Sequence, residues 1–189
     1  MTLAFDSDGL LPVGDHAMRI TELRSSVLVT GPHGGDPSWD TAWRAHLVDQ
    51  LGVLCVHLRE VGITDVYADG SFATDKLRPG DIDGYFICDF EAFLRDQFPR
   101  LVARDAAWDF RQRRPDAYGK MKPLMWHRYN IELFPHFNPP FESASIAATN
   151  NQGQSILFPE FFRRTRAGTP RTATVEGTPR GIVRIIPEK

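Results

Sequence analysis

Three acidic residues and a glycine–serine pair are the part of this sequence that can do chemistry. Asp81 and Asp83 stand on either side of Ile82 at the start of a β-prone run, and nine residues separate them from Gly70-Ser71. Alternate side chains of a strand share a face, so both carboxylates face one side while Ile82 faces the core. Two carboxylates this close stay ionised together only if a cation lies between them or one takes up a proton. The pair therefore indicates a site for a divalent metal ion.

The glycine–serine pair predicts an anion site facing these acids. Glycine lets the backbone turn sharply and approach a ligand closely. If Ser71 opens a short helix, its hydroxyl and the first backbone N–H groups form a site for phosphate. Mg²⁺ combines one or two carboxylates with substrate phosphates. Gly70 and Ser71 opposite Asp81 and Asp83 therefore predict a cradle for Mg²⁺, or Mn²⁺, and a nucleoside triphosphate.

Glu132 is the candidate for a third acid. It stands between Ile131 and Leu133 in a β-prone run. These apolar neighbours should face the core, which turns Glu132 to the opposite side of the strand. On an adjacent strand Glu132 would complete a two-metal site and act on the proton of an incoming hydroxyl. A solvated strand glutamate is the alternative.

The order of expected elements predicts an α/β fold of the α+β type, with a mixed β-sheet and flanking helices. Apolar residues at three- and four-residue spacing predict the clearest helix, at 39–60, with Ser38 as its N-cap. The other expected elements are an irregular arm at 1–19, a short helix running into an extended piece at 20–30, strands at 63–68, 81–89, 129–134 and 181–186, a helix at 90–104 that Pro99 kinks or divides, and an amphipathic piece at 156–162.

Length and composition predict one soluble domain. The 189 residues divide into an N-terminal arm at 1–37, a core at 38–134 and a C-terminal extension at 135–189 with a basic cluster and a final strand. A net charge of −2 argues against binding of bulk polyanions. There is no long apolar run and no basic, apolar leader, so we expect a cytoplasmic location and no membrane contact. Cys55 and Cys88 lie in apolar runs and should be buried free thiols.

The spacing of these motifs resembles the polymerase-beta-like nucleotidyltransferase superfamily. That signature is a Gly-Ser or Gly-Gly turn, an Asp-x-Asp strand some nine to thirteen residues on, and a third acid on a separate strand. The string Asp-Gly-Ser-Phe-Ala-Thr-Asp-Lys at 69–76, with Pro-Gly-Asp-Ile-Asp at 79–83, is also similar to small, little-characterised bacterial proteins of that superfamily. Asp69 and Gly84 depart from its pattern, which usually has apolar residues at both positions.

The resemblance implies a minimal nucleotidyltransferase-like core that moves a nucleoside monophosphate from a triphosphate such as ATP to a hydroxyl acceptor. In that interpretation Gly70 and Ser71 hold phosphate, and Asp81, Asp83 and Glu132 hold metal. The acceptor stays open between RNA, a protein and a small molecule. Small stand-alone members of the superfamily often resemble toxin–antitoxin or antiphage components, which implies a protein partner encoded nearby.

Several basic residues are further candidates for phosphate contacts. Lys76 lies between the two halves of the motif, and Arg163 and Arg166 belong to a dense C-terminal cluster. A solvated loop and a solvated face are equally good interpretations of these positions. Lys122 belongs to a basic and aromatic stretch at 118–129, which would either stack on a nucleotide or cover the sheet.

Two other functions fit the same residues. One is a catalytically inactive nucleotide- or partner-binding module on the same fold, which is favoured if Glu132 points away from the two aspartates. The other is a nucleotide-sugar or antibiotic adenylyl transferase, which would show a deep acceptor pocket in place of an open basic groove.

Overall fold

A five-stranded mixed sheet organises the chain, as predicted, and gives it a mixed α/β fold. The computed structural model describes residues 3–32, 36–140, 146–149, 153–165 and 176–188. The strand order is β1-β9-β2-β3-β6, with β1 parallel to β9, β3 parallel to β6, and the other pairs antiparallel. These strands are β1 Asp15–Met18, β2 Val66–Asp69, β3 Ile82–Cys88, β6 Ile131–Phe137 and β9 Ile182–Ile185.

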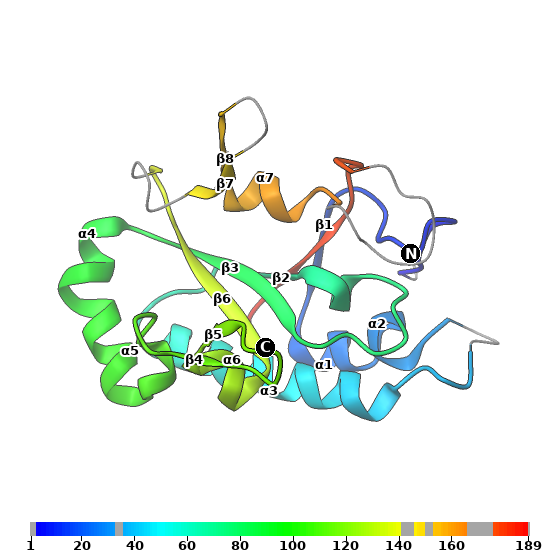
Figure 1. Cartoon of the computed structure of the whole chain (residues 1–189), viewed down its shortest axis with the longest axis horizontal. Coiled ribbons are helices and arrows are strands. Elements are labelled where there is room, and N and C mark those ends of the chain that lie inside the picture. Colours follow the sequence, from blue (N-terminus) through cyan, green and yellow to red (C-terminus); the bar gives the residue numbers. More distant parts are fainter. Residues whose placement is uncertain (1–2, 33–35, 141–145, 150–152, 166–175, 189) are drawn as a thin grey trace.

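Two small hairpins and several helices surround this sheet (Figure 1). The hairpins pair β4 Arg113–Pro115 with β5 Met121–Pro123, and β7 Ile146–Thr149 with β8 Ser155–Leu157. The α-helices are α1 Ile20–Arg24, α2 Val27–Thr30, α3 Thr41–Glu60, α4 Phe90–Ala92, α5 Phe98–Arg104, α6 Leu124–Tyr129 and α7 Phe158–Phe162. Short 3₁₀ turns are η1 Gly70–Ala73 and η3 Ala106–Trp108, and a π-helical turn is η2 Phe93–Gln97. Within the described ranges, no helix combines the length and the apolar character that crossing a bilayer requires.

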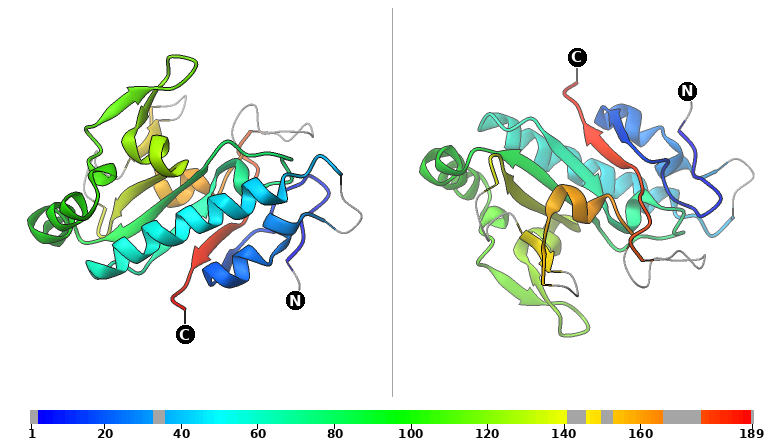
Figure 2. Two further views of the ribbon diagram at one scale, coloured as in Figure 1. Left: turned by 90° about the horizontal axis from the view of Figure 1, so that it is seen from below. Right: turned by 90° about the horizontal axis from the view of Figure 1, so that it is seen from above.

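The long helix α3 covers one face of the sheet, and α7 lies on the other (Figure 2). The leucines of α3 recur at three- and four-residue spacing and are fully buried against the sheet. Asp40 caps this helix, because its carboxylate accepts a hydrogen bond from the Trp43 N–H at 2.9 Å. The prediction of Ser38 as the N-cap was therefore wrong by two residues. Asp and Ser cap equally well, so the sequence alone does not decide between them.

The two faces of the sheet carry different clusters. Ile82, Phe86 and their neighbours join the main core beneath α3, together with the buried Cys55 and Cys88. Burial raises the pKa of both thiols to about 12, which agrees with inert free cysteines. On the other face, Tyr67 and Tyr85 stack at 4.7 Å between ring centroids, and Phe162 of α7 packs on them. This aromatic cluster covers only part of its face.

Three local predictions need correction. The stretch 1–19, expected to be irregular, contains β1, whose pairing with β9 joins the two ends of the chain. The stretch 20–30 forms two short helices with no extended piece, because Ser26 caps α2. The strand expected at 129–134 starts later and runs to Phe137, and α6 precedes it.

The helix expected at 90–104 is divided, as predicted, although the interruption is the π-helical turn η2 just before Pro99. Proline has no N–H to donate to the preceding turn, which favours the wider turn at this place.

Candidate metal centre

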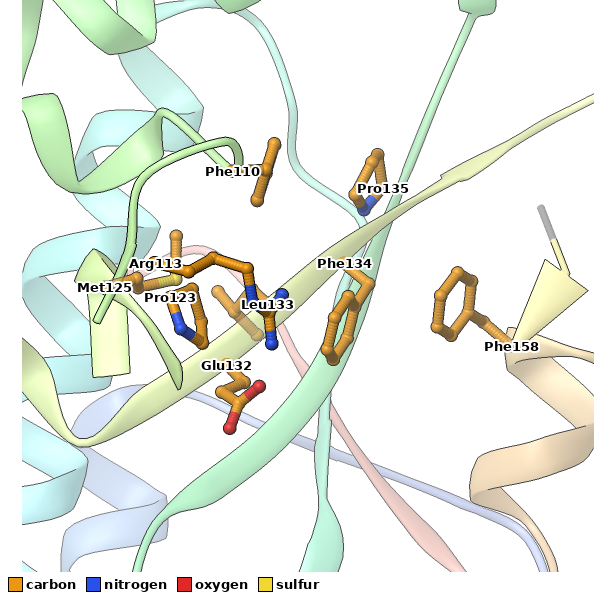
Figure 3. Close-up of a pocket in the computed structure, with 9 residues that line it drawn as sticks. All are labelled: Phe110, Arg113, Pro123, Met125, Glu132, Leu133, Phe134, Pro135 and Phe158. Carbon is orange, nitrogen blue, oxygen red and sulfur yellow. The ribbon is translucent and has the colours of Figure 1, made fainter. Parts of the chain in front are cut away.

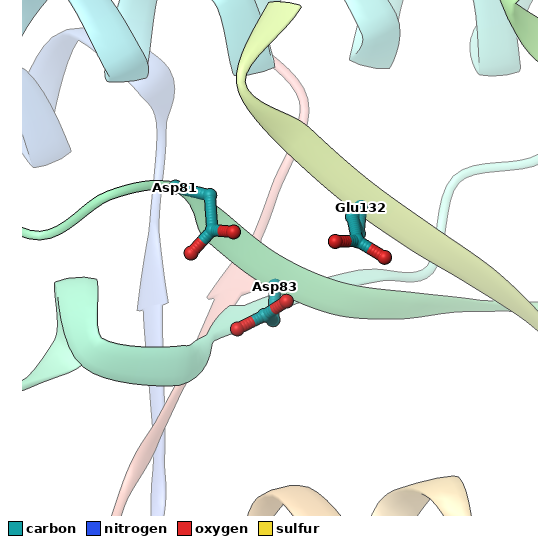
Figure 4. Close-up of side chains that lie close together, drawn as sticks. All are labelled: Asp81, Asp83 and Glu132. Atoms are coloured by element: carbon teal, nitrogen blue, oxygen red, sulfur yellow. The ribbon is translucent and has the colours of Figure 1, made fainter. Parts of the chain in front are cut away.

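Asp81, Asp83 and Glu132 converge on one point of the sheet. Each offers one carboxylate oxygen, and these oxygens lie within 4.8 Å of one another (Figure 4). Asp83 of β3 stands directly opposite Glu132 of the parallel strand β6. Ile82 and Ile131 are fully buried on the other face, so alternation fixes the direction of the acids. The set offers hard oxygen ligands, which suit Mg²⁺ or Mn²⁺.

The glycine–serine turn faces this acid cluster. Gly70 follows the end of β2 with φ +77°, a left-handed conformation that favours glycine. A Cβ atom built on Gly70 would lie 2.5 Å from Asp83 Oδ2, so only glycine allows the turn to approach the carboxylate this closely. The hydroxyl of Ser71 forms no hydrogen bond with any residue of the described ranges. The backbone of the turn and the carboxylates thus border one region.

Lys122 of β5 reaches into the acid cluster. Its Nζ lies 3.3 Å from Asp81 Oδ2 and also forms an ion pair with Glu132 Oε1. Burial lowers the pKa of Lys122, but the hydrogen bond to Glu132 and the charges of the acids raise that pKa by more. The ammonium therefore stays protonated among the carboxylates. Trp126 of α6 adds a hydrogen bond from Nε1 to Asp81 Oδ2 at 2.9 Å.

The two departures from the resemblance have a structural cause. Asp69 is fully buried and forms an ion pair with Arg180, whose Nη1 also donates to the Gly70 carbonyl at 3.2 Å. The charge at position 69 therefore holds the turn that carries Gly70. At position 84 a Cβ atom would lie 2.1 Å from the Tyr67 carbonyl oxygen, so the close approach of β2 and β3 excludes any side chain.

Arg44 of α3 supports the loop between the turn and the acids. Its buried guanidinium donates to the carbonyls of Leu28 at 2.6 Å, Phe72 at 2.9 Å and Thr74 at 3.0 Å, and also to that of Lys76. Burial lowers its pKa to about 9, which still leaves it charged at neutral pH. Arg44 thus fixes the backbone that leads from η1 towards Asp81.

The basic candidates have different surroundings. Lys76 is half-buried in the loop, and its side chain forms no hydrogen bond or ion pair with the described residues. Arg163 binds Asp15 at 2.8 Å and the Tyr85 hydroxyl at 2.8 Å, so the aromatic cluster and β1 hold it. Its assignment to phosphate stays a prediction. Arg166 lies outside the described residues.

A pocket of about 280 Å³ adjoins the acid cluster on the far side of Glu132. The rings of Phe110, Phe134 and Phe158 line it, and Arg113 of the β4–β5 hairpin extends across it (Figure 3). Glu132 therefore borders both the acid cluster and the pocket.

Sequence reasoning did not predict the contacts of four residues around this centre. Lys122 and Trp126 belong to the basic and aromatic stretch at 118–129, but that pattern does not show that they point at Asp81. Arg180 is 110 residues from Gly70, and no local pattern links the two residues. Arg44 could have been found, because it lies three residues before Leu47 on the apolar side of α3.

Comparison with known proteins gives a family but no activity. No curated protein and no solved structure matches this chain. One family model matches residues 3–186, which includes every strand of the central sheet and all three acids. By that match the chain belongs to DUF6932, a family of unknown function.

Proposed function

We propose that this protein is a metal-dependent nucleotidyltransferase that moves a nucleoside monophosphate from a nucleoside triphosphate to a hydroxyl acceptor. The observation that carries the proposal is the contact between the Gly70-Ser71 turn and the acid cluster. A phosphate held by the turn would lie beside Asp83, because no more than a glycine fits between them. If the Gly70-Ser71 turn and the acid cluster faced different surfaces of the protein, this chemistry would have no structural basis.

Asp81, Asp83 and Glu132 would hold Mg²⁺ or Mn²⁺ in this proposal. When bound, the metal would neutralise the charge of the phosphates and of the leaving group. The chain's own residues position the substrate. The Ser71 hydroxyl and the backbone N–H groups of η1 would bind phosphate oxygens, and Lys76, in the loop that follows η1, would add a positive charge.

The reaction is a displacement at the α-phosphorus. The acceptor oxygen forms a bond to this phosphorus while the bond to the bridging oxygen of the β-phosphate breaks, and pyrophosphate leaves. The acceptor proton passes to Glu132 and then to water. Glu132 suits this role because it borders both the acid cluster and the pocket beside it, from which an acceptor can approach.

A catalytically inactive binding module is the second candidate, and Lys122 is the observation that favours it. Its ammonium group already neutralises part of the charge of Asp81 and Glu132 without any metal. A module of this kind would bind nucleotide or a protein partner on the same turn but would not transfer it.

Incorporation of label separates the two candidates. Purified protein is incubated with each α-³²P-labelled nucleoside triphosphate, Mg²⁺ or Mn²⁺, and total cellular RNA, protein and small molecules. We expect label in one acceptor fraction with the wild type, and a loss of at least roughly 100-fold with Asp81→Asn or Asp83→Asn. The exposed Glu91 serves as the matched control, and Glu91→Gln should label as the wild type does. Equal labelling by all four proteins would refute the assigned site.

A further inference from the structure

The pocket beside Glu132 has the walls of a site for a flat, apolar ring. Phe110, Phe134 and Phe158 contribute aromatic rings, and Phe134 and Phe158 stack at 5.1 Å between centroids with 12° between their planes. Pro123 adds a further apolar surface. Aromatic and apolar walls of this kind favour planar ligands, because burial of the ring faces provides most of the binding energy.

The pocket lies on the acceptor side of the acid cluster. The strand order places β2, which leads into the Gly70-Ser71 turn, then β3 with Asp83, then β6 with Glu132. The β4–β5 hairpin and α7 contribute the outer walls of the pocket next to β6. A molecule in this pocket therefore meets Glu132 from the side opposite to the turn that we assign to the triphosphate.

Arg113 adds a positive charge at the mouth of this pocket. Its side chain is exposed and extends from β4 across the pocket towards Phe134 and Glu132 (Figure 3). One guanidinium nitrogen donates to the Met121 carbonyl at 2.8 Å, which fixes the group in place. Within the described ranges no carboxylate forms an ion pair with Arg113. Its remaining N–H donors can bind a carboxylate or phosphate group of a ligand.

We propose that this pocket binds a small planar organic anion whose hydroxyl group faces Glu132. This inference deepens the proposed function and rests on it in one respect, namely that the bound molecule is the acceptor. The volume of about 280 Å³ suits a molecule with one or two rings. Of the three acceptor classes the pocket thus selects the small molecule. The hydroxyl oxygen of this molecule would attack the α-phosphorus, its proton would pass to water, and pyrophosphate would leave.

The test measures binding without nucleotide or metal, so that its outcome does not depend on transfer activity. The probes are 4-hydroxybenzoate, 4-hydroxyphenylacetate and 5-hydroxyindole-3-acetate, which combine a ring, a hydroxyl and a carboxylate. Tyramine and serotonin keep the ring and the hydroxyl but carry an ammonium group instead. Saturation-transfer NMR and calorimetry give the dissociation constants. We expect at least one anionic probe to bind roughly tenfold or more tightly than its cationic counterpart.

Variants assign this binding to the pocket. Arg113→Met should weaken the anionic probe roughly tenfold, whereas Arg114→Met, on the same hairpin but outside the pocket, should leave it unchanged. Phe158→Leu keeps an apolar side chain but removes a ring, and it should weaken the probe without changing the preference for the anion. Thermal melting checks that each variant is folded.

Several results would overturn the inference. They are no binding by any anionic probe, equal binding of anion and cation, or equal loss in Arg113→Met and Arg114→Met. Failure of the labelling experiment with intact binding of the probes would reject the nucleotidyltransferase and leave the ligand pocket standing. Labelling of RNA or protein that depends on Asp81, with no binding of the probes, would reject the pocket and leave the transferase standing.

Discussion

Two groups of charged side chains lie next to each other on one face of the sheet and are balanced in different ways. Asp69, Asp83 and Glu132 form a row across β2, β3 and β6, because Asp69 stands opposite Asp83 and Asp83 opposite Glu132. Asp69 forms an ion pair with Arg180, and the side chains of Asp69 and Arg180 are 0% and 5% exposed. In the acid cluster, by contrast, Asp81 and Glu132 share the ammonium of Lys122, and the site is partly open.

The difference separates a structural charge from a charge that is available to a metal ion. Folding alone completes the balance between Asp69 and Arg180, and their contact fixes the Gly70 turn. In the acid cluster two carboxylates share one ammonium, and the three converging carboxylates offer oxygen ligands to a divalent cation. Carboxylates this close otherwise repel each other or take up protons. Acids of the same row therefore differ in their counter-ion. Asp69 pairs with a buried arginine, whereas the acid cluster can also bind a divalent cation.

Removal of the buried arginine tests this comparison with the largest expected effect. Arg180→Met would leave the charge of Asp69 in the interior without its arginine, and we expect the free energy of unfolding to fall by about 3–5 kcal/mol. Urea denaturation measures it. The double variant Asp69→Asn/Arg180→Met removes both charges and should recover part of this loss.

An exposed ion pair provides the matched control. Arg184 binds Asp65 at 2.7 Å, and both side chains are more than 40% exposed. Arg184→Met should therefore cost less than about 1 kcal/mol. If Arg180→Met costs no more than Arg184→Met, the pair with Asp69 is not the structural element that the comparison requires.

The convergence of the acids could be predicted from local patterns. Asp81-Ile82-Asp83 and Ile131-Glu132-Leu133 are short alternating runs, and alternation alone assigns a face to each carboxylate once the strands exist. The mixed sheet follows from the order of the elements in the same way. The long helix was also predicted, since its apolar spacing extends over five turns of chain at 41–60.

The rest depends on contacts between distant parts of the chain. The pairing of β1 with β9 and the contact of Arg180 with Asp69 each span more than 100 residues, and no local pattern encodes them. Lys122 reaches the acids only because the β4–β5 hairpin folds back over β6. The composition of a hairpin does not predict where in the fold it packs. The pocket beside Glu132 has the same origin, since its walls come from separate elements.

Replacement of Lys122 tests whether the acid cluster is available to a metal ion, and its expected effect is of intermediate size. Its ammonium group and a metal ion compete for Asp81 and Glu132. Lys122→Met should therefore increase the affinity for Mn²⁺ by roughly tenfold, as a single close charge pair is worth about one to two kcal/mol in a partly open site. Calorimetry with Mn²⁺ measures this affinity, and Lys120→Met, exposed in the same hairpin, is the control.

A different result would change the comparison. Unchanged or weaker Mn²⁺ binding by Lys122→Met would mean that the lysine helps to organise the carboxylates for the metal. A loss of stability as large as that of Arg180→Met would make the acid cluster a structural feature like the Asp69 pair.

The smallest expected effect concerns the buried, uncharged contact between His57 and Trp108. It tests whether burial of a titratable group makes the stability of the protein sensitive to acid. His57 accepts a hydrogen bond at Nδ1 from Trp108 Nε1 at 3.2 Å, and burial lowers the pKa of His57 below its usual 6.5, helped by the charge of Arg104. Below pH 6.5 the unfolded chain therefore binds a proton at this residue that the folded protein does not. Stability must then decrease as the pH falls through about 6.5.

Melting temperatures at pH 7.5 and 5.5 measure this effect. The wild type should melt at a lower temperature at pH 5.5, and His57→Asn, which cannot take up the proton, should reduce this drop by about 2 °C. Part of the drop should remain, because burial also lowers the pKa of His136. An equal drop in the wild type and in His57→Asn would show that His57 takes up its proton as readily in the folded protein as in the unfolded chain. Burial of His57 would then have no part in the acid sensitivity of the protein, and the drop would belong to other groups such as His136.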